Sequence, residues 1–177
     1  MSVYWITGLS GAGKTTIGRQ LYKRLKESNV PTVFLDGDEL RTVFGDTFGY
    51  TLEERLKCSV CYSRLCKMLA AQGLIVVCCT VSMFDSVRNW NRENIQGYVE
   101  IYIKTSHEEL ERRNQKGLYL SKFNRLNNVV GVDLKAELPK TPDIVIENNG
   151  DLLFDDYVSL IIEKGVSANP LWVGGNT

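Results

Sequence analysis

The chain has 177 residues, and its 21 Lys and Arg residues balance 21 Asp and Glu residues, so the formal net charge is zero. This balance argues against a broad surface for nucleic acids or membranes, although it leaves room for a local basic pocket. The length predicts one domain over residues 1–177. We also expect a cytoplasmic protein, because no leader precedes the first apolar run and the longest run, Leu74–Cys79, is too short to cross a bilayer.

The first predicted elements are a strand, a glycine-rich turn and a helix. Val3–Thr7 is β-branched and aromatic, which is typical of a strand. Gly8–Thr15 matches the phosphate-loop pattern G-x-x-x-x-G-K-[ST] in full. Ile17, Leu21 and Leu25 recur every four residues and therefore predict a helix. Strand, loop and helix in this order form the context in which backbone N–H groups cradle phosphates.

This loop predicts a site for ATP and Mg²⁺. Lys14 is expected to reach the β- and γ-phosphates and to take part in catalysis, and the hydroxyl of Thr15 is expected to ligate the metal. The nucleotide-binding residues expected from the loop are Gly8, Ser10, Gly11, Ala12, Gly13, Lys14, Thr15 and Thr16.

A second cluster follows the predicted strand Thr32–Leu35. Asp36 and Asp38 are two residues apart and would point to the same side of an extended chain, beside the phosphate loop. A carboxylate there can accept a proton from an attacking hydroxyl or hold Mg²⁺ through water. The alternative for Asp38 is an N-cap of a short helix. Arg41 is placed to grip an anionic acceptor.

The remaining pattern alternates between helices and strands. Helices are predicted from Leu52 to Gly73, over Glu108–Asn114, and through Leu153, Tyr157 and Ile161 in a C-terminal helix and tail over 151–177. Further strands are predicted at Leu74–Cys79, Val99–Ile103 and Ile144–Ile146. This order predicts an α/β fold with a five-stranded parallel sheet covered by helices on both faces, and ligands bound at the carboxyl ends of its strands. The irregular basic segment 116–140 is expected to be a lid, or else a surface loop.

Several motifs together resemble one family. They are Gly8–Thr15, Leu35–Asp38 with Arg41, Gly73–Val76, Lys116–Tyr119, Asn128–Asp133 and Pro139–Asp143. Over roughly residues 1–150 the chain is similar to adenylylsulfate kinases. The resemblance implies a three-layer P-loop NTPase fold and transfer of the γ-phosphate of MgATP to the ribose 3′-hydroxyl of adenosine 5′-phosphosulfate. It also implies, by analogy only, a homodimer.

The resemblance implies roles for individual residues. Asp38 matches the catalytic acid–base carboxylate, Arg41 and Arg55 match arginines that hold the anionic group of the acceptor, and Tyr50 stands where a phenylalanine stacks on its base. The other expected acceptor-site residues are Asp36, Ser82, Phe84, Lys116 and Val129, and Arg113 and Lys116 match cations near the nucleotide phosphates. The plainer alternatives are core aromatics for Tyr50 and Phe84 and solvated helix charges for Arg55 and Arg113.

The chain departs from the family pattern on the acceptor side. Lys57–Cys61 replaces a Glu-Asn-Ile-Arg-Arg run, and Val129 aligns with a second base-stacking phenylalanine. One ring and one aliphatic wall would favour a smaller base than a purine. Asn89–Ile95 also resembles kinase-like members of bacterial surface-polysaccharide clusters, and cytidine diphosphoramidate is one proposed acceptor in such pathways. Both acceptors therefore stay open.

Two other classes of function are weighed against a kinase. A GTPase switch would need an Asn-Lys-x-Asp motif, which is absent, and Asp46–Gly49 matches D-x-x-G without a strand before it. A nucleotide-binding regulatory domain stays a remote alternative because of the altered Cys58–Cys61 stretch. A zinc site is not expected, because the Cys58 and Cys61 pair has no second pair and His107 is the single histidine.

Overall fold

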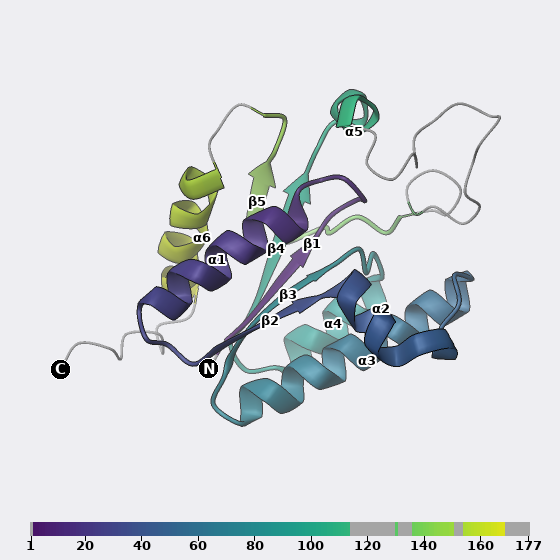
Figure 1. Ribbon diagram of the computed structural model, residues 1–177, viewed down its shortest axis with the longest axis horizontal. Helices are drawn as coiled ribbons and strands as arrows, with labels where there is room; N and C mark the ends of the chain where they lie inside the picture. The colour runs from purple at the N-terminus through teal and green to yellow at the C-terminus, as the bar shows by residue number, and fades with distance from the viewer. Residues whose placement is uncertain (1, 114–129, 131–135, 151–153, 169–177) are drawn as a thin grey trace.

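The computed structural model describes residues 2–113, 130, 136–150 and 154–168. In this part of the chain, five parallel strands form one sheet in the order β2-β3-β1-β4-β5 (Figure 1). The strands are β1 Val3–Thr7, β2 Thr32–Asp36, β3 Ile75–Thr80, β4 Tyr98–Lys104 and β5 Ile144–Glu147. Each of the five predicted strands is confirmed: β1 has the predicted ends, and the other four strands differ from the prediction by one residue at one or both ends.

Helices cover both faces of the sheet, as predicted. They are α1 Lys14–Glu27, α2 Gly37–Phe44, the 3-10 helix η1 Gly45–Thr47, α3 Leu52–Ala71, α4 Asp85–Asn94, α5 His107–Arg113 and α6 Phe154–Ala168. α1 and α6 lie on one face, whereas α3 and α4 lie on the other (Figure 1). None of the helices among the described residues combines the length and apolar character needed to span a membrane.

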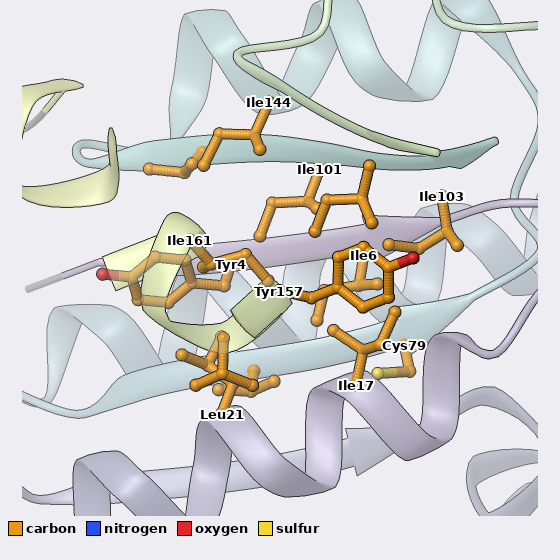
Figure 2. Close-up of a cluster of buried hydrophobic side chains, with 14 of the residues drawn as sticks. Tyr4, Ile6, Ile17, Leu21, Cys79, Ile101, Ile103, Ile144, Tyr157 and Ile161 are labelled. Carbon is orange, nitrogen blue, oxygen red and sulfur yellow. The ribbon is translucent and has the colours of Figure 1, made fainter. Parts of the chain in front are cut away.

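Two apolar cores follow from the alternation of side chains along β1. Tyr4 and Ile6 belong to the core under α1 and α6, and Val3 and Trp5 belong to the core under α3 and α4. Figure 2 shows Ile17 of α1 and Tyr157 of α6 in the core that contains Tyr4 and Ile6. The central strands β1 and β3 are buried along their whole length and are mostly apolar, whereas the edge strand β5 exposes every second residue.

Capping side chains fix two helix starts that matter for the site. Asp36, not Asp38, is the N-cap of α2, because its side chain accepts a hydrogen bond from the Asp38 N–H. Thr51 begins α3 in a capping box with Glu54, in which each side chain accepts from the backbone N–H of the other. The alternative that Asp38 caps a helix is therefore wrong.

Candidate active site

The phosphate loop lies between the carboxyl end of β1 and the start of α1, and its shape requires glycine. Gly13 is the N-cap of α1 with φ of 95°, in the left-handed region. A Cβ at Gly13 would lie 2.5 Å from Nδ2 of Asn148, and one at Gly8 would lie 2.6 Å from the carbonyl oxygen of Ile103. The backbone at these two positions therefore approaches its neighbours more closely than any side chain permits.

Lys14 and Thr15 connect this loop to the rest of the site. The buried Lys14 donates from Nζ to the carbonyl oxygen of Leu9 at 2.7 Å. The exposed Thr15 donates from Oγ1 to Oδ2 of Asp36 at 2.7 Å. Asp36 is the last residue of β2, so this bond joins the two clusters that sequence analysis picked out separately.

The two aspartates occupy different environments. Asp36 is buried, and its Oδ1 accepts from the Asp38 N–H at 2.9 Å while its Oδ2 accepts from Thr15. Asp38 is exposed in the first turn of α2. Because α2 begins at Gly37, the extended geometry expected for this pair is wrong. One carboxylate is held between loop and helix, and the other faces solvent.

Tyr50, Arg41 and Arg55 come together at the start of α3. The guanidinium carbons lie over the Tyr50 ring, 4.7 Å from its centroid for Arg41 and 5.2 Å for Arg55. Arg41 also donates to the carbonyl oxygens of Phe48 and Gly49, at 3.1 and 3.0 Å, and Arg55 donates to that of Tyr50 at 3.0 Å. Burial and the neighbouring Arg41 charge lower the pKa of Arg55. This cluster offers a planar surface beside two positive charges.

Tyr50 is not a core aromatic, because 58% of its surface is exposed. Phe84, by contrast, is half-buried and packs against the core under α3 and α4. Ser82 is buried after β3, and its hydroxyl has no hydrogen-bond partner among the residues that the structure describes. Cys58, one of the positions that depart from the family pattern, is also buried in that core.

Arg113, at the end of α5, contacts the phosphate loop and is not a solvated helix charge. Its Nη1 donates to the Gly11 carbonyl at 3.3 Å, and its Nη2 donates to the Asn148 carbonyl at 3.0 Å. Glu109 accepts from Nε of Arg113 at 2.7 Å and also from Arg112. Hydrogen bonds from these two arginines lower the pKa of Glu109 to about 2.

Asn148 is a site residue that sequence analysis missed. It is buried and directly follows β5, at the carboxyl ends of the strands, where a parallel sheet binds ligands. This position after a predicted strand is the one feature of the sequence that could have identified it. The expected site residues Lys116 and Val129 lie outside the described residues, as does most of the expected lid over 116–140.

Comparison with known proteins identifies the family. Residues 1–147 match the model of a family described as adenylylsulphate kinase. The chain belongs to the adenylylsulphate kinase family. It is 40% identical over 163 residues to the cytidine diphosphoramidate kinase of Campylobacter jejuni, covering 92% of this chain and 95% of the relative. It is 38% identical over 149 residues to the adenylyl-sulfate kinase of Pseudomonas aeruginosa, covering 82% and 76%.

A solved adenylylsulphate kinase has the same fold. The structure of the Mycobacterium tuberculosis enzyme in complex with AMPPNP and APS superposes with a TM-score of 0.84 and 27% identity, covering 92% of this chain and 96% of that one. These likenesses confirm the predicted three-layer P-loop fold and the predicted class of enzyme, a kinase.

Proposed function

We propose that this chain transfers the γ-phosphate of ATP to the ribose 3′-hydroxyl of a nucleotide, with adenosine 5′-phosphosulfate as the acceptor that its family implies. The observation that carries the proposal is the 2.7 Å hydrogen bond from Thr15 to Asp36. It joins the phosphate loop to the turn that holds Asp38, so a donor phosphate and an acceptor hydroxyl can meet there. Phosphoryl transfer depends mainly on such positioning and on charge neutralisation.

The donor side has suitable groups for MgATP. Backbone N–H groups of the loop and the ammonium of Lys14 would bind the phosphates, with Arg113 and Lys116 as further cations. The Thr15 hydroxyl and the Asp36 carboxylate supply hard oxygen atoms, the ligand type that Mg²⁺ prefers. Bound Mg²⁺ would neutralise negative charge on the β- and γ-phosphates.

On the acceptor side, Asp38 would orient the 3′-hydroxyl and accept its proton. The hydroxyl oxygen then bonds to the γ-phosphorus, the bond to the β-phosphate oxygen breaks, and ADP leaves with that electron pair. Arg41 and Arg55 would hold the anionic end of the acceptor, and Tyr50 would stack on its base. Ser82 and Phe84 would complete this side, with Val129 opposite the base.

Cytidine diphosphoramidate is a second candidate acceptor. It is favoured by the 40% identity to a kinase named for this compound, over 95% of that relative. The exposed ring of Tyr50, with the aliphatic Val129 expected opposite, also suits a pyrimidine, which has less surface to stack than a purine. The reaction and the residue roles would be the same for both acceptors.

A side-by-side assay tests the proposal. Purified protein is incubated with MgATP and each acceptor in turn, and the product is detected by the mass of one added phosphoryl group. We expect efficient turnover of one acceptor, and the ratio of the two kcat/KM values identifies it. Turnover of neither, with good turnover of another nucleotide, would overturn both acceptor assignments. Nucleotide binding without transfer to any acceptor would favour a regulatory domain.

A further inference from the structure

Asn148, which directly follows β5, is hydrogen-bonded to the backbone of the phosphate loop. Its side chain is buried, with 2% of the residue exposed, and its Nδ2 donates to the Ala12 carbonyl oxygen at 2.8 Å. Its own backbone N–H donates to the Lys104 carbonyl at 2.8 Å, which extends the pairing of β5 with β4. The amide therefore stands on the rigid end of the sheet and fills the space that a side chain at Gly13 would need.

Arg113 holds the adjacent peptide of the same loop. It reaches the Gly11 carbonyl from Nη1 at 3.3 Å, and its Nη2 lies 3.4 Å from Oδ1 of Asn148. Glu109 fixes the guanidinium through its 2.7 Å bond to Nε. Two consecutive loop carbonyls, those of Gly11 and Ala12, are thus held by groups at the ends of α5 and β5.

Fixing a carbonyl also fixes the N–H of the same peptide, because the two point in opposite directions across a planar trans bond. The Gly11–Ala12 peptide illustrates this: its carbonyl faces Arg113, and its N–H donates to the Leu9 carbonyl at 3.1 Å. The Lys14 ammonium donates to that same Leu9 oxygen. By the same geometry, the bond from Asn148 to the Ala12 carbonyl turns the Gly13 N–H away from Asn148.

We propose that Asn148 is a positioning residue for the donor nucleotide: its amide orients the Ala12–Gly13 peptide so that the Gly13 N–H is aimed at a phosphate before the nucleotide arrives. The inference rests on one part of the proposed function, namely that a nucleoside triphosphate binds to the phosphate loop as the donor. It assigns Asn148 no contact with the reacting atoms.

The test compares Asn148→Asp with the matched control Asn149→Asp. The first substitution nearly preserves the shape of the side chain and keeps an oxygen for Arg113, but it replaces the amide donor to the Ala12 carbonyl with an acceptor. The longer bond to that carbonyl from Oγ1 of Thr105, at 3.4 Å, remains. The second adds the same charge one residue away, where the exposed Asn149 keeps its Oδ1 acceptor for the Ser106 N–H. The affinity for ADP is measured by calorimetry, and KM for ATP, KM for the acceptor and kcat are measured separately.

We expect Asn148→Asp to weaken ADP binding and raise KM for ATP about tenfold, the size of one hydrogen bond lost together with a new repulsion. KM for the acceptor should stay within about twofold, and Asn149→Asp should change none of these values by more than about twofold. A selective loss on the donor side is a result that a merely structural asparagine would not give.

Unchanged ADP affinity in folded Asn148→Asp would overturn the proposal, as would an equal effect of Asn149→Asp. If Asn148→Asp does not fold, the neutral Asn148→Ser is measured in the same way, and failure of both to fold would show that the amide serves the fold and overturn the proposal. Failure of the proposed function is recognised separately. In that case the native chain binds ADP but phosphorylates no acceptor, and the comparison of ADP affinities still decides the role of Asn148.

Discussion

Replacing Tyr50 with Ala should weaken acceptor binding while leaving phosphoryl transfer intact. The ring is 58% exposed and has the guanidinium carbons of Arg41 and Arg55 at 4.7 and 5.2 Å from its centroid, so it is available to a base at the edge of the site. Stacking on an aromatic side chain contributes about 1–3 kcal/mol per base. Its loss should therefore raise the acceptor KM by a factor between about 5 and about 150.

The same substitution should change little else. Arg55 is bonded to the backbone carbonyl of Tyr50, and Arg41 to those of Phe48 and Gly49, so both arginines keep these partners without the ring. Loss of exposed cation–π contacts should lower the free energy of unfolding by about 1–2 kcal/mol in total. KM for ATP should stay within about twofold, because the donor loop is not touched.

Initial rates over a range of acceptor concentrations, at saturating MgATP, measure the effect. Tyr50→Phe is the matched control, since it keeps the ring and removes the hydroxyl, and its acceptor KM should stay near that of the native chain. An unchanged acceptor KM in Tyr50→Ala, or an equal rise in both variants, would refute the stacking role.

Two further predictions concern charge pairs that stabilise the fold. The pKa of Glu109 is lowered from 4.5 to about 2, so its ion pairs stabilise the fold above pH 4.5 and are lost as the pH falls toward 2. Acid unfolding, followed by circular dichroism, should therefore depend more steeply on pH in the native chain than in Glu109→Gln. Equal slopes in the two proteins would contradict this. Arg88→Ala should lower the free energy of unfolding, measured in urea, by about 3 kcal/mol, because it removes one ion-pair partner of the buried Glu100. The double variant Arg88→Ala with Glu100→Gln should recover part of that loss. No recovery in the double variant would contradict a stabilising ion pair between these two residues.

The sequence predicts those parts of the fold whose signals are local. The central strands β1 and β3 are recognisable because burial on both faces makes them apolar runs, and the edge strand β5 is recognisable by its β-branched residues, of which Val145 is exposed. The phosphate loop was recognisable because glycine spacing, lysine and hydroxyl stand in eight consecutive residues, Gly8–Thr15. α4 was not predicted, because its buried face includes Arg88 and Asn91, so the apolar spacing of a helix is interrupted.

Contacts between distant residues could not be predicted in this way. Asn148 acts on Ala12 across 136 positions of sequence, and nothing near either residue signals the pairing. The extended backbone expected for Asp36 and Asp38 was wrong because the Asp36 side chain caps α2, which begins at Gly37 and so ends the extended chain. Family resemblance added roles for Arg41, Tyr50 and Arg55, and the structure brings these three side chains together at the start of α3.

The rate of phosphoryl transfer by Asp38→Asn tests the central claim most directly. The substitution keeps the size of the side chain and the Asp36 cap on the Asp38 N–H, but it removes the group that accepts the proton. With the acceptor that the native chain prefers, kcat should fall at least about 100-fold, the lower end of what a general base contributes, while ADP affinity stays unchanged. A variant that still forms the 3′-phosphorylated product at a rate near that of the native chain would contradict a reaction centred on this carboxylate.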